Sequence, residues 1–479
     1  MIQPATSEKL ASLRQGRLPS ASTVPVPRRK PKFYLIDHSL TKMGGHHFDS
    51  ARLLLRAAVD MGFEPVLATN RRLRDRDGFP ADWTILPLFQ DTTYSNFSAT
   101  AGSANSPSDP LGPPSTDGNT PWWSKLAGKW NRWNQRRQAL SFASACREVY
   151  RQIPAASGDQ VLIPTLSEFD LVGLSEFLRT SEAATLCDWH LQFHYEFLKG
   201  PATSYGKQLP RHAAMQAHFA GVAARAGKVR WHFYSPTSAL VDQYTSLGIV
   251  RFQLLEHPVD STIDSRDTFQ PFRPAENNSP LRVLCAGGLR ANKGSSLLTE
   301  LLADLERDDF AQGKIQLWIQ ANRPGKLKRI AGRHKIVTLR PTDDFPPASA
   351  RLVHVQHPLP NDAYARLLRR ADVGLLAYDP NVYAVRCSGV LVEMLAAGTP
   401  VVVPANTWLA DELRSAGDPS PGLVASELAG FAASLREMAN QRGEFQRRAQ
   451  AAAPSYALRH SPLRVIEQLL NNARAKAAA

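Results

Sequence analysis

The sequence predicts an α/β protein made of two doubly wound domains of similar size. Short apolar runs, typical of buried strands, alternate with longer segments of helical periodicity, first from Lys32 and again from Leu281. A polar, proline-rich stretch, "DSRDTFQPFRPAENNSP", separates the two series. The chain of 479 residues is also longer than one hydrophobic core usually serves, which favours two or more domains.

The first series follows a basic segment, residues 1–30, that is rich in Pro and Ser and predicts a disordered tail. "KFYLID" predicts a strand, "HHFDSARLLLRAAVDMG" a helix ending at Gly62, and "EPVLATN" a second strand. Between the first strand and the helix lies a glycine-containing loop, "HSLTKMGG". Later strands are expected at "DQVLIPT", "ATLCDWHLQFHY" and "VRWHFYS". We therefore predict a first domain at 31–265, with a low-complexity insert at 97–120.

The second series predicts a domain at 281–455, joined to the first by a linker at 266–280. Its strands are expected at "LRVLCAGG", "KIQLWIQAN", "RLVHVQ", "DVGLLAY" and "VVVP". Helices are expected at "SSLLTELLADLERD", at "NDAYARLLRRA" and within "CSGVLVEMLAAG". The last segment, 456–479, has a helical pattern from about Pro462.

The charge balance, 57 − 43 = +14, favours partners that carry phosphate or other acidic groups. Nucleic acid is not expected among them, because the sequence has no zinc-finger spacing and no RNA-binding aromatic motif. The four cysteines are far apart and form no CxxC pair, which disfavours a disulfide framework or a zinc site. A reducing cytoplasm fits this pattern best.

The segment 122–137 mixes Trp with Lys and Arg and has two interpretations. One is an interfacial helix that contacts an anionic membrane peripherally. The other is a helix packed on its own domain with its cations in solvent. The apolar residues form no clean stripe, which favours the second interpretation.

The helix within "CSGVLVEMLAAGTPVVV" carries a carboxylate among apolar residues. Ser388 is the predicted N-cap of this helix, and Gly398 marks its predicted end. The free N–H groups of the first turn, near Gly389, then form an anion site beyond the carboxyl end of a strand. Glu393 lies four residues later on the same face and leans toward the helix start. It can therefore reach hydroxyl groups next to a bound anion, such as those of a ribose. The alternative is a glutamate that points to solvent or pairs with an arginine.

A second anion-binding loop is expected at "AGGLRANKGSS". Its glycines allow close backbone approach, and Arg290 and Lys293 supply charge for phosphate oxygens. The loop is neither a Walker A motif nor a GxGxxG motif. Arg386, directly before the helix of Glu393, adds a third cation. In a doubly wound sheet both loops can converge on one diphosphate.

These motifs, in the order "GGLRANKG", "LPNDAYARLLRRADVGLLAY" and "SGVLVEMLAAGTPVVVP", resemble those of retaining glycosyltransferases of the GT-B fold, in the family 4-like group. The N-terminal "KMGGHHFDSARLLLRAAVDMGFEPVLAT" looks like the first βαβ unit of that group. The resemblance covers roughly residues 32–470. It implies two Rossmann-like domains that face a cleft, and a C-terminal helix that crosses back to the first domain.

The resemblance also implies roles for single residues. Lys293 would bind the diphosphate of a nucleotide sugar, with Arg290, Ser388, Gly389 and Arg386 beside it. Glu393 would match the later Glu of the family's paired-Glu motif and hold the ribose. Gly44 and Gly45 would approach the diphosphate or sugar from the first domain. No cofactor and no bound metal are expected.

Two positions depart from the family pattern. The earlier Glu of the motif falls at Val385, and the usual loop arginine falls at Gly288. Arg386 and Arg290 are the candidate replacements.

The first domain should supply a catalytic group near the anomeric carbon. His194 is the first candidate and His190 the second, because a His after such a strand often lies in the cleft of this family. The alternative for both is a core histidine with satisfied hydrogen bonds. His46 and His47 are candidates for the acceptor side.

The expected function is transfer of a sugar, with retention, from a nucleotide-diphosphate sugar to a glycan, lipid or small acceptor. Polysaccharide biosynthesis in the cytoplasm is the expected setting. Two alternatives stay open: a nucleotide-sugar epimerase on the same fold, and a scaffold that binds nucleotide sugar or glycan without turnover.

Overall fold

The computed structural model describes residues 29–93, 122–200, 202–260, 279–310, 312–332, 334–340, 343 and 345–478. For residues 122–132 it describes the backbone and not the side chains. The predicted tail up to residue 28, the predicted insert at 97–120 and most of the predicted linker lie outside the described residues.

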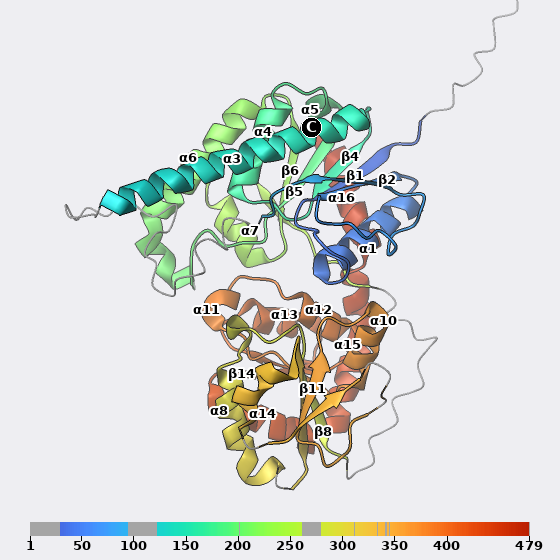
Figure 1. Cartoon of the computed structure of the whole chain (residues 1–479), viewed down its shortest axis with the longest axis vertical. Helices are drawn as coiled ribbons and strands as arrows, with labels where there is room; N and C mark the ends of the chain where they lie inside the picture. The colour runs from blue at the N-terminus through green and yellow to red at the C-terminus, as the bar shows by residue number, and fades with distance from the viewer. Residues whose placement is uncertain are drawn as a thin grey trace, which may run out of the picture. The chain divides into compact units, whose positions relative to one another are not determined.

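The first domain is a parallel sheet of seven strands in the order β3-β2-β1-β4-β5-β6-β7, with helices on both faces (Figure 1). Strand burial alternates between the faces: Tyr34 and Ile36 join one core, Phe33 and Leu35 the other. The strands are β1 (Lys32–Asp37), β2 (Glu64–Asn70), β3 (Thr84–Phe89), β4 (Gln160–Ile163), β5 (Asp188–Gln192), β6 (Arg230–Ser235) and β7 (Phe252–Leu254). The helices are α1 (His46–Asp60), α3 (Trp122–Gln152), α4 (Glu168–Leu178), α5 (Ala183–Leu186), α6 (Leu209–Ala226) and α7 (Ser238–Thr245).

The second domain repeats this architecture with the strand order β10-β11-β9-β8-β12-β13-β14, again all parallel. Val283 and Leu317 pack on one face of the sheet, and Leu284 and Trp318 pack on the other. The strands are β8 (Leu281–Cys285), β9 (Ile315–Ala321), β10 (Ile336–Leu339), β11 (Leu352–Gln356), β12 (Val373–Leu375), β13 (Val401–Pro404) and β14 (Gly422–Ala425). The helices are α8 (Leu297–Leu305), α9 (Lys328–Ala331), α10 (Asn361–Arg370), α11 (Pro380–Tyr383), α12 (Gly389–Ala396), α13 (Trp408–Ala416), α14 (Leu428–Asn440) and α15 (Arg442–Arg459).

The four edge strands, β3, β7, β10 and β14, were not among the predicted elements. β7, β10 and β14 have only three or four residues each, and at least half of the residues in each of the four strands are not fully buried. Such strands lack the continuous apolar run that marks a central parallel strand. The predicted fold, two Rossmann-like domains of alternating strands and helices, is confirmed.

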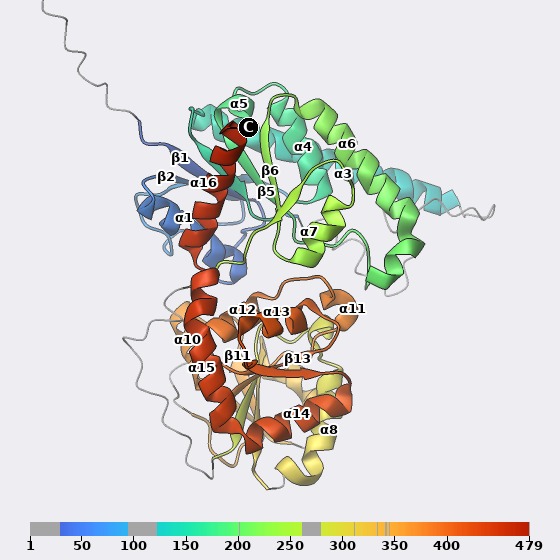
Figure 2. The ribbon, with the colours of Figure 1, turned by 180° about the vertical axis from the view of Figure 1, so that it is seen from behind.

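The last helix, α16 (Pro462–Ala478), packs on the first domain (Figure 2). Val465, Ile466, Leu469 and Leu470 of α16 share one core with residues of β1 and α1, Leu54 among them. The predicted return of the C-terminal helix to the first domain is therefore confirmed.

Helix α3 joins the first domain through its C-terminal half. Phe142, Ala143, Cys146 and Val149 are buried in the domain core, whereas Trp133 is 56% exposed. Of the segment 122–137, proposed for membrane contact, only residues 133–137 have described side chains, so that prediction remains untested. No described helix is long and apolar enough to cross a membrane.

Candidate functional site

The second domain reverses its strand order between β8 and β12. From β8 the chain continues to β9 on one side, and from β12 it continues to β13 on the other. Ligands of open α/β sheets bind beyond the carboxyl ends of strands at such a switch point. The two loops predicted to bind an anion follow β8 and β12, so the fold brings them together there. At Gly294 a Cβ would lie 2.1 Å from the carbonyl oxygen of Ala377, so only glycine permits this approach.

Lys293 is the central cation of this region. Its Nζ donates to the carbonyl of Gly287 at 3.3 Å and lies 5.1 Å from the centre of the Tyr378 ring. A Cβ at Gly287, whose φ is 86°, would lie 2.7 Å from this Nζ. Burial lowers the pKa of Lys293, and the charge of Arg290 lowers it further, whereas Tyr383 and Glu393 raise it. The ammonium group therefore lies in a place where an anion would stabilise its charge.

His357, which follows β11, was not predicted as a site residue. Its ring would lie 3.1 Å from a Cβ at Gly288, so the imidazole covers this glycine. Its Nδ1 is buried with no hydrogen-bond partner among the described residues. Burial lowers the pKa of His357, and four nearby cations lower it further: Lys293, Arg290, Lys42 and Lys326.

This gathering of charge combines predicted and unpredicted residues. Arg290 and Lys293 come from the predicted loop, Lys42 from the loop after β1, and Lys326 from the short 3-10 helix Pro324–Leu327. We call these four cations with His357 the cation cluster. Arg290, Lys42 and Lys326 are exposed to solvent and Lys293 is partly buried, so an anion bound among them would reduce their mutual repulsion.

Helix α12 starts beside this cluster as the sequence predicted. Ser388 is its N-cap, and the Ser388 Oγ accepts a hydrogen bond from the backbone N–H of Leu391 at 3.3 Å. His257, which follows β7, contributes an unpredicted group here, because its Nε2 would lie 3.0 Å from a Cβ at Gly389. Burial lowers the pKa of His257 to about 3, so the ring is neutral at neutral pH. A neutral imidazole and a helix N-terminus can both donate to one anion.

Glu393 lies one turn into α12 and meets α10 rather than an arginine. The hydroxyl of Tyr364 donates to Glu393 Oε2 at 2.8 Å. Burial raises the pKa of Glu393 to about 7, and Asp49 of α1 adds to this rise, while Tyr364 and Lys293 oppose it. Asp49 itself accepts a hydrogen bond from Asn361. Glu393 also acts on Lys293, so its carboxylate offers an acceptor close to the cation cluster.

Arg386 has a different contact from the predicted one. Its guanidinium forms a two-pronged ion pair with Glu196 of the first domain, with Nε–Oε2 at 2.6 Å and Nη2–Oε1 at 2.8 Å. It also lies 5.6 Å from the centre of the Tyr195 ring. Close by, the Thr237 hydroxyl donates to the carbonyl of Val385 at 2.7 Å. Arg386 and Val385 therefore link the domains, and the charges of Arg386, Lys293 and Arg290 all act on Tyr383.

We expect Glu196→Ala and Arg386→Ala to lower the free energy of unfolding by about 1–3 kcal/mol each. Glu196→Ala removes the carboxylate partner of the Arg386 guanidinium, and Arg386→Ala leaves the buried Glu196 with Lys199 as its cationic partner. Denaturant unfolding of both variants and of the double variant measures this. If the double variant loses as much unfolding free energy as the two single variants together, the two residues are not coupled and the ion-pair interpretation is contradicted. Arg179→Ala, which removes an exposed ion pair with Glu176, is the matched control.

The predicted catalytic residue His194 follows the carboxyl end of β5 in the first sheet. Burial lowers the pKa of His194 to about 4, as does the charge of His47, while a hydrogen bond to the carbonyl of Pro164 raises it. His47 in turn bonds through Nδ1 to Asp37 Oδ2 at 2.9 Å, and His46 is exposed. The neutral His194 ring can therefore accept a hydrogen bond on its other nitrogen.

His190 lies inside the sheet, away from these groups. It is fully buried, its Nδ1 bonds the Tyr234 hydroxyl at 3.2 Å, and its Nε2 bonds Gln160 Oε1 at 3.0 Å. Both ring nitrogens are thus satisfied within the core. The predicted strand "ATLCDWHLQFHY" contained both histidines, but β5 ends at Gln192.

We expect His190→Ala to lower the free energy of unfolding by about 1–3 kcal/mol, because the buried Gln160 Oε1 and the Tyr234 hydroxyl each lose a hydrogen bond. Turnover by the folded fraction should be unchanged. Thermal unfolding and an activity assay on the same sample measure both quantities. A normal melting temperature with lost turnover would restore His190 as a catalytic candidate.

Gly44 and Gly45 form the turn into α1. Their φ angles, 77° and 83°, are in the left-handed region, and no other atom lies within 4 Å of where their Cβ atoms would be. The charge of Lys42, in the same loop, lowers the pKa of His357, so the loop borders the cation cluster. Gly44 and Gly45 leave open space next to the cluster.

Comparison with solved structures gives many similar folds. A sucrose-phosphate synthase from Thermosynechococcus elongatus matches 94% of this chain and 100% of its own, with a TM-score of 0.57 and 13% identity. A UDP-forming α,α-trehalose-phosphate synthase from Burkholderia xenovorans matches 92% and 100%, with a TM-score of 0.61 and 11% identity. The Anabaena protein HepE, solved with UDP-glucose, matches 93% and 99%, with a TM-score of 0.53 and 11% identity.

The chain has the GT-B fold. These matches cover nearly its whole length, and its two parallel seven-stranded sheets with flanking helices have the architecture of these glycosyltransferases. No protein-family model and no curated protein sequence matches the chain. Among the residues that the structure describes, no group of three or more His, Cys, Asp or Glu side chains is arranged to hold a metal ion.

Proposed function

We propose that this protein is a glycosyltransferase that moves a sugar from a nucleotide-diphosphate sugar to an acceptor. The observation that carries the proposal is the cation cluster at the switch point of the second sheet, next to the N-terminus of α12. The complex of HepE with UDP-glucose supports it, because that protein binds a nucleotide-diphosphate sugar on a similar fold.

The donor diphosphate would lie between the loop after β8 and the start of α12. Lys293 and Arg290 would contact its oxygens, and the N–H groups of the first turn of α12 would donate to it. His257 and His357 offer further donors on the same region. The partly buried ammonium group of Lys293 would be stabilised by the bound diphosphate, because burial has removed part of its hydration and lowers its pKa.

Catalysis would come from charge stabilisation as the leaving diphosphate departs. Negative charge grows on its oxygens, and cations already in place around it lower the energy of the transition state. The proposal needs no resident metal ion, because Lys293, Arg290, Lys42 and Lys326 can supply the positive charge. We propose transfer with retention on the front face of the sugar, which is the outcome that the resemblance to retaining GT-B enzymes implies.

Glu393 would accept hydrogen bonds from the ribose hydroxyls, and Tyr364 would hold its carboxylate in place. His194, neutral and with one nitrogen free to accept, would contact the sugar from the first domain. The acceptor, a glycan, a lipid-linked glycan or a small molecule, would approach past Gly44 and Gly45.

A panel of UDP-, GDP-, ADP- and TDP-sugars tests the proposal. We expect release of a nucleoside diphosphate from at least one sugar, and clearly slower release from Lys293→Ala and from Glu393→Ala at the same concentration. Release that survives both changes would place the chemistry elsewhere. Thermal stabilisation by a nucleotide sugar without any release would contradict a transferase and favour a binding scaffold. Conversion of one nucleotide sugar into another would favour an epimerase.

A further inference from the structure

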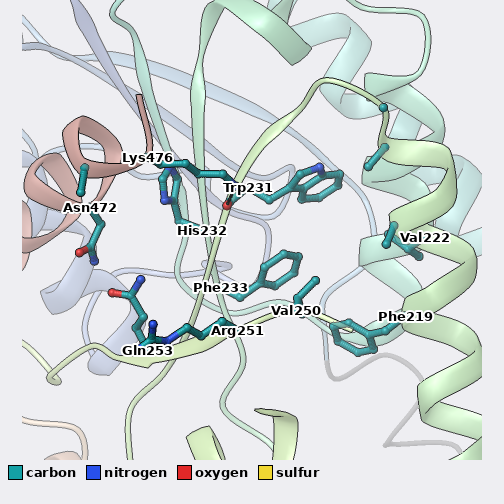
Figure 3. Close-up of a pocket in the computed structure, with 14 residues that line it drawn as sticks. Phe219, Val222, Trp231, His232, Phe233, Val250, Arg251, Gln253, Asn472 and Lys476 are labelled. Atoms are coloured by element: carbon teal, nitrogen blue, oxygen red, sulfur yellow. Dashed lines mark hydrogen bonds between the residues drawn. The ribbon is translucent and has the colours of Figure 1, made fainter. Parts of the chain in front are cut away.

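A cavity of about 460 Å³ lies at the edge of the first sheet, between α6, β6, β7 and α16 (Figure 3). The amino-terminal half of β6, in the first sheet, lines it. It is therefore separate from the cation cluster, which borders the carboxyl ends of strands of the second sheet. Its volume is within the range of small-molecule sites.

The cavity arises from the way β7 leaves the sheet. The two strands pair only from Phe233 opposite Phe252 onward, so Trp231 and Val250 diverge before that point. Both residues line the opening that results. Lys476 of α16 closes part of the exposed strand edge, since its Nζ donates to the carbonyl of Trp231 at 2.8 Å.

One half of the cavity is apolar. Trp231 and Phe233 alternate along β6 toward α6, and their rings stack with centroids 5.8 Å apart. Phe219 and Val222 of α6 and Val250 complete this half, as Figure 3 shows. The indole N–H of Trp231 is buried and has no hydrogen-bond partner among the described residues. A buried donor without an acceptor is costly and fits a ligand that supplies one.

The other half is polar and positive. His232, Arg251, Gln253, Asn472 and Lys476 lie on the α16 side in Figure 3. The described residues that line the cavity include no Asp or Glu. Asp188 lies 3.4 Å from His232 Nε2, and its carboxylate accepts from the Arg230 guanidinium at 2.9 Å. Burial lowers the pKa of Lys476, and the charge of Asp188 opposes this change. Because Arg230 offsets the charge of Asp188, the two lining cations with their amide neighbours favour a negative group.

We propose that this cavity binds an anionic single-chain amphiphile. Its alkyl or aromatic body would lie against Trp231 and Phe233, and its carboxylate or phosphate would face Arg251 and Lys476. This ligand is distinct from the sugar donor. The cavity lies at the amino-terminal ends of β6 and β7 in the first sheet, whereas the donor region lies at the carboxyl ends of β8 and β12 in the second sheet. The proposal stands independently of transferase activity.

Calorimetric titration of the full chain tests the proposal, with decanoate and decyl phosphate below their micelle concentrations and decanol below its solubility limit. We expect both anions to bind at least about tenfold more tightly than decanol. Ala223→Phe, at an exposed position of α6 that lines the cavity, should weaken all three. Arg251→Gln should weaken the two anions to the level of decanol and leave decanol unchanged.

Ala224→Phe, which is exposed on the same helix but does not line the cavity, is the matched control and should bind as the unmodified protein does. Unchanged melting temperatures show that the variants are folded. Equal binding of anions and decanol, or anion binding that survives both Ala223→Phe and Arg251→Gln, would overturn the proposal. Co-sedimentation with phosphatidylglycerol vesicles that Ala223→Phe abolishes would identify a membrane lipid as the ligand. Calorimetric binding without co-sedimentation would identify a free amphiphile.

Discussion

Lys293→Ala is expected to lower the rate of nucleoside diphosphate release by about 10²-fold to 10³-fold. Lys293 is the cation that both predicted loops surround, with its Nζ against Gly287 and beside the Tyr378 ring. Removing one preorganised charge from the position where negative charge develops costs about 3–4 kcal/mol of transition-state stabilisation. Initial rates at saturating donor measure this change directly.

Lys328→Ala is the matched control, because Lys328 is an exposed lysine on α9 outside the cluster. Its rate should equal that of the unmodified protein. Lys293→Arg keeps the charge but changes its shape and reach, and we expect a partial loss. Equal rates for Lys293→Ala and Lys328→Ala would remove Lys293 from the catalytic machinery.

The second large effect is a pH dependence of nucleotide affinity that Glu393 controls. The pKa of Glu393 is raised to about 7 by burial and by Asp49. A ribose hydroxyl donates to a carboxylate better than to a neutral carboxyl, so the binding-competent form is the ionised one. We expect the affinity for a nucleoside diphosphate to fall about tenfold between about pH 8 and about pH 6.

Glu393→Gln separates this effect from titration of the nucleotide itself. The variant should bind more weakly, and the part of the pH dependence that comes from Glu393 should vanish. The phosphate groups titrate equally in both proteins, so the difference between the two curves isolates residue 393. Parallel curves for the two proteins would contradict the assignment of Glu393 to the ribose.

The same group predicts a change in stability of the free protein. Its folded-state pKa of about 7 lies above the ordinary value of 4.5. The neutral carboxyl therefore contributes stability that is complete below about pH 4.5 and is lost as the pH rises to about 7. Glu393→Gln should be more stable than the unmodified protein at about pH 8, by no more than about 3 kcal/mol, and similar to it at about pH 4.5. Denaturant unfolding at the two pH values measures this difference.

The central strands and the loops of the second domain were predictable because their signals are local. "LRVLCAGG" and "VVVP" are continuous apolar runs, and Ser388 caps the helix it precedes. The predicted elements placed Lys293 and Gly389 at neighbouring strand ends, where the fold does bring their loops together.

The contacts that define the rest of the site join residues distant in sequence. His257 meets Gly389 and Lys42 acts on His357 across long separations, and no local pattern marks either pair. Arg386 looked like a phosphate ligand from its position before α12, yet Glu196 lies 190 residues away and forms its ion pair. His194 and His190 were the first and second candidates for the same role, but the end of β5 separates His190, a core residue, from His194, a loop residue.

The central claim is that the loops after β8 and β12 bind one diphosphate. Hydrogen–deuterium exchange of the full chain with and without UDP, GDP, ADP or TDP tests it most directly. For the nucleotide that binds, we predict slower exchange in residues 286–296 and in the first turn of α12, and loss of this protection in Lys293→Ala. Slower exchange confined to segments outside these two loops, or protection that Lys293→Ala leaves intact, would contradict the claim.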